Sequence, residues 1–371
     1  MKLYCHRPSL VAAFQIVSGV VPARTPKDIL KKVKLQVVEG KATLIGTDQE
    51  VGIRYDIPGV EIESPGETLL PTNRLISILR ELTEDGVKIE VDGDAVWIRA
   101  GHSEFRLPAE DPAEFPDVAA FDEERYRVVP GNVFKEAVRR TIFSTDVEST
   151  RYALGGVLLE FQEDLMTLVA TDTRRLAVVK VACRSQGVEQ AENPMPVVPS
   201  KAMSLIERSL AESDEDVFIA VHANDVLVKS GHSTIYSRLV EGRFPKYQDV
   251  IPSKTGVSLE LVAGPFFSAV RQAQIVTNEE SRGVDFTFSG GLLTLDSQAA
   301  DVGESKVELP ISYEADKLTI MFDPRYIAEF LRVLEPEKQI TLELIDPDTA
   351  AVFRTDEAYT YVIMPLSREQ N

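Results

Sequence analysis

The chain has 371 residues, of which 44% are hydrophobic and 27% charged, and its formal net charge at pH 7 is −19. Because no long apolar run is present, this composition predicts a soluble globular protein with several cores and excludes a membrane-spanning one. Cys5 and Cys183 are the two cysteines and lack metal-ligand spacing, so a disulfide framework is not expected. The opening MKLYCHRPSL lacks the apolar stretch of a signal peptide, and we expect a cytoplasmic protein.

The first third of the chain predicts a strand, a helix, several strands, a second helix and further strands. An extended segment in 2–21 runs into an amphipathic helix at 9–19, a second helix follows at 72–82, and 87–107 alternates as strands do. Between them, the apolar run LIGTD at 44–48 ends in Asp48 and opens a turn.

The same order of elements returns twice along the chain. The remaining helices are predicted at 132–143, 200–210, 265–276 and 324–334. LVATD (168–172) and LLTLD (292–296) repeat LIGTD, so that Asp48, Asp172 and Asp296 stand 124 residues apart. This period is close to the size of a domain and far longer than a solenoid repeat of ~20–50 residues, which predicts three similar domains.

Helix entries and hairpin turns carry further signals. Thr72, Ser200 and Asp323 are predicted N-caps of the second helices, and Pro324 suits a first helical position. Gly-His-Ser occurs at 101–103 and again at 231–233. We interpret both copies as duplicated hairpin turns rather than as a role for their histidines.

The joints between domains are rich in proline and charge. They lie at 109–125 and 241–256, and both contain Phe-Pro. We therefore expect domains near 1–120, 121–253 and 254–371. Each should be an α+β domain with antiparallel sheets and two helices.

The search for catalytic chemistry gives no candidate. The four histidines offer no metal-ligand spacing, and the chain has no glycine-rich phosphate loop and no nucleophile elbow. We predict no catalytic, cofactor-binding or metal site. An enzyme whose residues converge only in three dimensions stays an open alternative at this point.

Charge is distributed unevenly between the helices and the rest of the chain. The six predicted helices contain ten basic and four acidic residues, a net charge of about +6, which leaves about −25 elsewhere. Helices tolerate Arg and Lys on any exposed face, so this pattern is compatible with plain solubility. It is also compatible with a basic helical surface inside an acidic shell, as a nucleic-acid-binding protein would need.

Several segments together resemble the bacterial DNA polymerase III β subunit, the sliding clamp. They are the opening MKLYCHRPSLVAAFQIVSGVVPARTP, the segment RYALGGVLLEF with LVATDTRRLAV, the joint EGRFPKYQDVIP and the ending YTYVIMPL. The resemblance covers the whole chain in order. It implies a non-enzymatic protein that encircles duplex DNA without sequence specificity, and a head-to-tail homodimer whose helices line a central hole.

The resemblance also implies a hydrophobic groove for short peptides of the replicative polymerase, the clamp loader and repair proteins. The positions that match the groove are Leu154, Thr171, Arg174, Arg175, Leu176, Pro245, Val250, Val362, Ile363, Met364, Pro365 and Leu366. Asp172 would then introduce the groove, whereas Asp48 and Asp296 would mark ordinary strand-end turns. A flexible apolar lining suits several related peptides.

Two further sets of residues follow from the same resemblance. The expected DNA-facing residues are Arg24, Arg74, Lys135, Arg139, Arg140, Lys201 and Arg325. In the expected dimer contact, Phe105 and Leu107 on an edge strand meet Ile275 and Val276 of the partner. The alternative is that these four are ordinary core residues.

The chain departs from the family pattern in three places. Thr173-Arg174 stands where members commonly have Gly-His, Asp249 occupies a position that is often basic, and the tail continues through 367–371. These departures leave the peptide preference open. A protein-binding scaffold and a repair enzyme with clamp-like domains are the alternative functions.

Overall fold

The computed structural model describes most of the chain. The described residues are 1–121, 124–148, 153–187, 193, 195–210, 215–254, 256–278, 282–300, 302–356 and 358–367. They form two compact units, each assembled from two stretches of sequence. The first combines Met1–Lys135 with Cys183–Val240, and the second combines Glu136–Ala182 with Glu241–Asn371.

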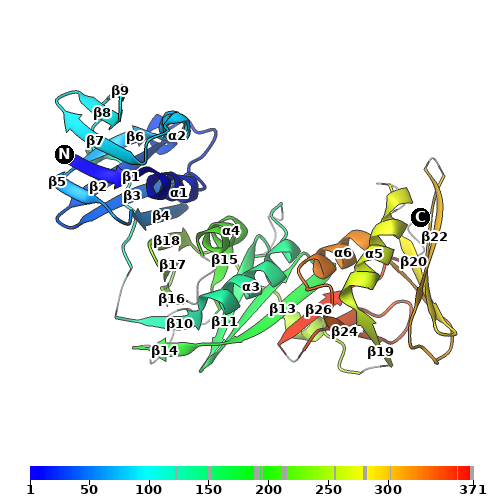
Figure 1. The fold of residues 1–371 in the computed structure, drawn as a ribbon. Helices are drawn as coiled ribbons and strands as arrows, with labels where there is room; N and C mark the ends of the chain where they lie inside the picture. Colours follow the sequence, from blue (N-terminus) through cyan, green and yellow to red (C-terminus); the bar gives the residue numbers. More distant parts are fainter. Residues whose placement is uncertain are drawn as a thin grey trace. The chain divides into compact units, whose positions relative to one another are not determined.

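The first unit contains two antiparallel sheets (Figure 1). The smaller has the order β5-β1-β7-β8-β9, with strands Glu61–Ser64, Lys2–His6, Gly86–Asp92, Ala95–Ala100 and Ser103–Pro108. The larger has the order β14-β10-β16-β17-β18-β4-β3-β2-β6, with strands Arg184–Gln186, Tyr126–Pro130, Asp216–Val221, Asp225–Ser230, Ser233–Arg238, Val51–Asp56, Lys41–Thr47, Lys32–Val38 and Gly66–Pro71.

Helices of the first unit pack their apolar faces inward. They are α1 (Arg7–Val17), α2 (Thr72–Glu81) and α4 (Ser200–Ser209), which the short strand β15 (Val197–Pro199) precedes. In α2, Leu75, Ile78 and Leu79 are buried at helical spacing on one side. Helices α1 and α2 contact each other, as Figure 1 shows. The 3₁₀ turns are η1 (Asp28–Lys31) and η2 (Pro112–Glu114).

The second unit also contains two antiparallel sheets. One includes the order β11-β12-β13-β26-β25-β24-β19, with strands Gly156–Gln162, Leu165–Thr171, Arg175–Ala182, Tyr359–Ile363, Ala351–Arg354, Gln339–Leu344 and Val257–Val262. The other has the order β22-β21-β20-β23, with strands Gly303–Pro310, Leu292–Ala299, Val284–Ser289 and Leu318–Phe322.

Two helices, α5 (Ala263–Ala273) and α6 (Pro324–Arg332), contact each other in this second unit. Helix α3 (Gly131–Thr141) begins in the first unit and ends in the second. The 3₁₀ turns η3, η4 and η5 are Ile142–Ser144, Tyr247–Val250 and Gln274–Val276.

An aromatic core lies between α6 and the large sheet of the second unit. Phe330 stacks on Tyr361 with ring centroids 4.7 Å apart and an interplanar angle of 7°. The buried hydroxyl of Tyr361 donates to the Tyr326 carbonyl, and that of Tyr359 donates to the Arg140 carbonyl, each at 2.9 Å. Because both hydroxyls are hydrogen-bonded, burying these polar groups does not leave them unsatisfied.

Strand pairing explains why the compact units mix distant stretches of sequence. Ile235 of β18 pairs with Ile53 of β4, and Val178 of β13 pairs with Thr360 of β26. Backbone ladders therefore connect successive copies of the repeat within each unit. The domain boundaries near 121 and 254 stay a prediction.

The predicted elements are confirmed. The order strand, helix, strands, helix, strands occurs three times, and all six predicted helices lie within three residues of their expected bounds. Gly101 (φ +54°) and Gly231 (φ +51°) turn the hairpins β8–β9 and β17–β18, as the repeated Gly-His-Ser predicts. Asp323 caps α6 through its side chain, which accepts from the Arg325 N–H at 3.0 Å.

Two predicted N-caps are wrong. Pro71 and Pro199 precede α2 and α4 as the N-cap residues, and neither helix has a side-chain cap. Thr72 and Ser200 are the first helical residues instead. Proline holds φ near −65°, so it directs the chain into the helix by geometry rather than by a hydrogen bond.

The prediction that the third aspartate of the repeat, Asp296, opens a turn is also wrong. Asp48 and Asp172 directly follow strands β3 and β12 and open tight turns, as predicted. Asp296 instead lies in the middle of β21, opposite Asp285 and Lys306. Strand β21 continues to Ala299, so the equal spacing of the three residues does not reflect an equal place in the fold.

Candidate functional site

A small pocket of about 180 Å³ lies in the second unit. Its walls come from the turn between β12 and β13, the loop that contains η4, and the end of β26. The lining residues are Thr171, Thr173, Arg174, Arg175, Leu176, Pro245, Lys246, Tyr247, Val250, Val362 and Met364. Sites for whole small molecules usually measure ~300–1,000 Å³, so this pocket suits one or two side chains of a larger ligand.

One wall is a turn held by four hydrogen bonds. The Asp172 carboxylate accepts from the backbone N–H groups of Arg174 and Arg175, both at 3.0 Å. Thr171 donates its hydroxyl to the Arg175 carbonyl at 2.6 Å and accepts from the Thr173 N–H at 3.1 Å. These bonds hold Thr173 at φ 74°, a left-handed conformation that β-branched residues rarely adopt. The side chains of the turn are therefore presented to the pocket in a fixed arrangement.

Arg175 joins this turn to helix α6. Its guanidinium donates to the Asp172 carboxylate at 3.0 Å, to the Phe143 carbonyl at 2.6 Å, and to the Glu329 carboxylate. Its centre lies 4.5 Å from the ring centroid of Tyr326. Burial disfavours the charged form, but the interactions with Tyr361, Glu329 and Asp172 outweigh this and raise the pKa of Arg175 above its ordinary value. Arg175 is therefore a permanent cation that organises the wall of the pocket.

The floor of the pocket is apolar and its mouth is partly basic. Leu176 and Val362 are buried, and Val250 and Met364 are partly exposed at the edge. Tyr247 donates its hydroxyl to the Glu160 carboxylate at 2.5 Å, and burial together with this carboxylate raises its pKa. An apolar side chain can enter here without displacing a hydrogen bond of Tyr247.

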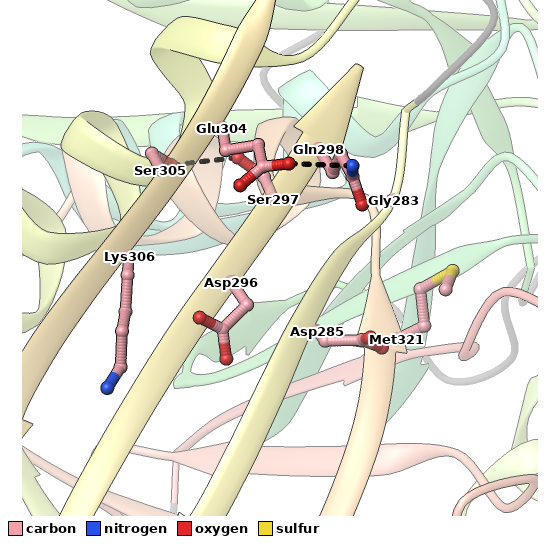
Figure 2. A pocket seen from close by; sticks show the side chains of 9 residues that line it. All are labelled: Gly283, Asp285, Asp296, Ser297, Gln298, Glu304, Ser305, Lys306 and Met321. Carbon is pink, nitrogen blue, oxygen red and sulfur yellow. Dashed lines mark hydrogen bonds between the residues drawn. The ribbon is translucent and has the colours of Figure 1, made fainter. Parts of the chain in front are cut away.

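A larger hollow of about 660 Å³ lies on the four-stranded sheet β22-β21-β20-β23. Figure 2 shows that its lining is polar and comes from neighbouring strands. Gln298 donates to Glu304 at 2.8 Å, and Ser297 and Ser305 are 2.9 Å apart. Because these side chains already bond to one another and the lining of the hollow is more polar than that of the smaller pocket, the smaller pocket is the better candidate site.

Other site types find little support in the described residues. Among these, no group of three or more His, Cys, Asp or Glu side chains could hold a metal ion. Burial raises the pKa of the Cys5 thiol to about 12, so that thiol is protonated at neutral pH. In the part of the chain that the structure describes, no helix combines the length and hydrophobicity that a membrane span requires.

Comparison with known proteins covers the whole chain. Family models of the DNA polymerase III beta subunit match residues 1–119 (N-terminal domain), 128–246 (central domain) and 248–367 (C-terminal domain). The beta sliding clamp of Pseudomonas putida is 30% identical over 373 residues, covering 99% of this chain and 100% of that protein. The chain belongs to the DNA polymerase III beta subunit family.

Solved structures of sliding clamps have the same fold. The crystal structure of the DNA polymerase sliding clamp from Bacillus subtilis gives a TM-score of 0.91 at 26% identity, with 99% of each chain covered. A sliding clamp from Pseudomonas aeruginosa bound to griselimycin gives 0.90 at 28% identity, again with 99% of each chain covered. The predicted arrangement of three clamp domains with antiparallel sheets is confirmed.

Most residues predicted for the clamp's peptide groove come together at the small pocket. Those that line it are Thr171, Arg174, Arg175, Leu176, Pro245, Val250, Val362 and Met364. Four others do not line it: Leu154 and Ile363 are buried, Pro365 is half-buried, and Leu366 donates its backbone N–H to the Met321 carbonyl. Ile363 points away because its neighbour Val362 faces the pocket and side chains alternate along β26. Their role in peptide binding stays a prediction.

Three lining residues were not anticipated from the sequence. Thr173 and Lys246 are exposed at the mouth, and Tyr247 is buried in the floor. The sequence of the second joint could have indicated two of them. Lys246 and Tyr247 directly follow Pro245, which was already assigned to the groove. Asp249 is exposed in η4 and does not line the pocket. Ser367 is exposed, and residues 368–371 of the tail lie outside the described part of the chain.

The basic residues predicted to face DNA in this clamp differ in how firmly they are held. Lys201 pairs with Asp48, Arg325 with Asp323 at 2.6 Å, and Arg140 with Glu136 at 2.5 Å. Lys135 donates to the Leu210 carbonyl at 3.1 Å. Arg24, Arg74 and Arg139 are exposed, and Arg139 also has an interaction partner. Contact of any of the seven with DNA stays a prediction.

The residues predicted for the clamp's dimer contact lie on an edge strand and in a 3₁₀ turn. Phe105 and Leu107 belong to β9, the last strand of the five-stranded sheet; Phe105 is half-buried and Leu107 is buried. Val276 is half-buried in η5, whereas its neighbour Ile275 is 75% exposed, more than any other bulky apolar side chain described. A single exposed apolar side chain is common on protein surfaces, so the contact of these four residues with a partner stays a prediction.

Proposed function

We propose that this protein is a DNA sliding clamp that encircles duplex DNA and tethers the replicative polymerase, giving processive replication. The observation that carries the proposal is the family match along the whole chain, together with the eight predicted groove residues that line one pocket. The role needs no catalytic group, and we propose that the protein is not an enzyme. Incision of DNA or hydrolysis of nucleotide by the purified protein would argue for the repair-enzyme alternative.

Binding to DNA is proposed to be topological and independent of sequence. With a net charge of −19, the protein is a poor candidate for tight binding to open DNA, because phosphate contacts need a basic surface. A few exposed arginines such as Arg24 and Arg74 can contact phosphates weakly while the clamp moves.

Loading onto DNA tests this proposal directly. The protein is incubated with a clamp loader, ATP and nicked circular DNA, and the DNA is then separated by gel filtration. We expect the protein to stay with the circle and to be released when the circle is cut once. Equal retention on linear DNA would contradict encirclement, and failure to load would favour the scaffold alternative.

A head-to-tail homodimer is proposed to close the ring. Each chain contributes three similar domains, so two chains supply six, and a head-to-tail contact closes into a ring when its rotation allows. Ile275→Asp should give a monomer in analytical ultracentrifugation, because a carboxylate cannot be buried in an apolar contact. Val147→Asp is the matched control, since Val147 is 74% exposed and lies outside the proposed contact. A dimer that survives Ile275→Asp at micromolar concentration would contradict this interface.

Partner peptides of the polymerase, the clamp loader and repair proteins are proposed to bind at the pocket. Deleting the chain from Tyr361 is a poor test, because Tyr361 is fully buried in β26 between β13 and β25. Val250→Asp is sharper, since this side chain is 52% exposed at the pocket edge. It should weaken binding of the polymerase in surface plasmon resonance, whereas Val38→Asp, on a 48% exposed valine of β2, should not.

A further inference from the structure

Three basic side chains line the pocket, and they differ in how their charge is balanced. Arg175 is buried and contacts two carboxylates, those of Asp172 and Glu329. Arg174 and Lys246 are exposed at the mouth. Arg175 therefore belongs to the structure of the wall, and the other two are available to a ligand.

Arg174 is held in place by a neutral group. Its Nη1 donates to the Tyr326 hydroxyl at 3.3 Å, and this hydrogen bond raises the pKa of Arg174. The Arg174 carbonyl accepts from the Met364 N–H at 2.8 Å, so the backbone is tied to the end of β26. A phenol does not neutralise a guanidinium, and Asp172 and Asp323 act on Arg174 only through longer-range charge interactions. None of the ion pairs of the described residues includes Arg174, so its guanidinium is available to a ligand at the pocket mouth.

Lys246 has a similar electrostatic position. It is the N-cap residue of η4, and no carboxylate among the described residues forms an ion pair with it. Four nearby carboxylates have other partners: Asp172 and Glu329 pair with Arg175, Asp323 pairs with Arg325, and Glu160 accepts from Tyr247. Asp249 is exposed in η4 beside Val250. No acidic side chain lines the pocket itself.

An apolar floor next to two cations that form no ion pair among the described residues sets the chemistry of the ligand. The floor accepts an aliphatic or aromatic side chain, and the cations attract negative charge more strongly once water is displaced from the apolar surface. A neutral or basic residue next to the apolar anchor gains nothing from Arg174 or Lys246. An Asp or Glu beside the anchor can form a charge-assisted hydrogen bond to either.

We propose that the pocket selects partner peptides in which an apolar anchor is flanked by Asp or Glu side chains. This inference rests on the proposed peptide-binding function. Arg174 and Lys246 belong to two separate segments, the β12–β13 turn and the start of η4, so a chain that passes over the pocket can meet both. Side-chain carboxylates can occupy both places, whereas a peptide C-terminus supplies a single carboxylate.

Fluorescence anisotropy on the full-length protein tests the proposal with three labelled peptides. Each has two adjacent leucines at its centre; the first has Asp on both sides, the second has Asn there, and the third has Asn there with a free terminal carboxylate directly after the leucines. We expect the Asp peptide to bind about tenfold more tightly than the Asn peptide at low salt, from two partly exposed charge pairs. This ratio should fall as salt is added.

Variants of the two cations locate the effect. Arg174→Gln keeps a donor for Tyr326, and Lys246→Gln removes the charge but keeps a polar side chain that is one atom shorter. In each variant the ratio of Asp to Asn affinity should fall about threefold. Lys180→Gln is the matched control, because Lys180 is exposed on β13 and does not line the pocket. The control should keep the full ratio.

Each outcome separates the inference from the function on which it rests. Equal binding of the Asp and Asn peptides, or an Asp advantage that both Gln variants retain, overturns the inference while the peptide site stands. Tighter binding of the peptide with the free carboxylate than of the Asp peptide also overturns it. If none of the peptides binds and the polymerase also fails to bind, the proposed function of the pocket is wrong.

Discussion

The turns at 47–51 and 171–175 have the same backbone and different uses. In each, an aspartate accepts from two backbone N–H groups and a threonine accepts from one N–H and donates to one carbonyl. The middle residues, Gln49 and Thr173, have φ of 82° and 74°. The two copies of the repeat therefore share a turn with the same backbone conformation and the same hydrogen bonds.

The two turns differ in the residue that ends them. Val51 is apolar and buried in the first, and Asp48 uses its second carboxylate oxygen to pair with Lys201 at the surface. In the second, Arg175 takes that oxygen itself and reaches Glu329 as well. The turn at 171–175 thus has a long cation where the turn at 47–51 has an apolar residue, and this cation connects the turn to α6 in the wall of the pocket.

The largest expected effect comes from removing that cation. Arg175→Met should lower the free energy of unfolding of the second unit by about 3 kcal/mol or more, because Asp172 and Glu329 lose their shared partner. Lys201→Met, at the partner of the first turn, should cost no more than about 1 kcal/mol, since Lys201 is 52% exposed. Urea unfolding with hydrogen exchange of β13 and β3 measures both. Equal losses would show that the two turns are held alike.

A smaller loss should follow when the first turn loses its acceptor. Asp48→Ala removes the group that accepts from the N–H groups of Glu50 and Val51, and we expect a cost of about 1 to 2 kcal/mol. Asp48→Asn keeps an oxygen at this place and should cost less. If Asn and Ala are equally destabilising in urea unfolding, the ion pair to Lys201 matters more than the turn.

The same aspartate should make the first unit sensitive to acid. Burial raises the pKa of Asp48, but hydrogen bonds from Lys201 and from the N–H groups of Val51 and Glu50 outweigh it and hold the pKa below the ordinary value of 3.8. A lowered pKa in the folded protein means that the charged form contributes stability above pH 3.8, which is lost as the pH falls through the lowered value. The stability difference between wild type and Asp48→Asn should therefore shrink in this range. A difference that stays constant to the end of the acid transition would contradict this.

The smallest effect concerns strain in the two turns. Thr173→Gly should raise stability by about 0.5 to 1 kcal/mol, because glycine adopts positive φ freely and a β-branched residue does not. Gln49→Gly should change it by less than about 0.5 kcal/mol, since an unbranched side chain is less strained there and glycine is more flexible when unfolded. Thermal unfolding of both variants gives the comparison. A loss of stability in Thr173→Gly would mean that the Thr173 side chain holds the pocket mouth.

Much of the candidate site could be predicted because the family resemblance assigned positions to the groove along the whole chain. Thr171 ends β12, Arg175 and Leu176 begin β13, and Val362 and Met364 lie at the end of β26 and just after it. Lys246 and Tyr247 were missed although Pro245 and Val250 of the same loop were assigned, because an irregular loop has no periodicity that shows which further side chains face the pocket. Leu154 and Ile363 were assigned to the groove although their side chains do not line the pocket, since a family resemblance gives a position without the direction of its side chain.

The sequence by itself determined the three similar domains, the six helices and the strand-rich remainder, because hydrophobic periodicity and turn residues are local signals. Tertiary structure decided what those signals could not. Backbone pairing of β13 with β26 brings residues 171–176 beside residues 362–364, and Arg175 then meets α6. Tertiary structure also distinguished Asp296 from Asp48 and Asp172, because a residue inside a long strand and a residue at its end can follow equally apolar runs. Long-range pairing of this kind depends on which surfaces meet, and no short segment contains that information.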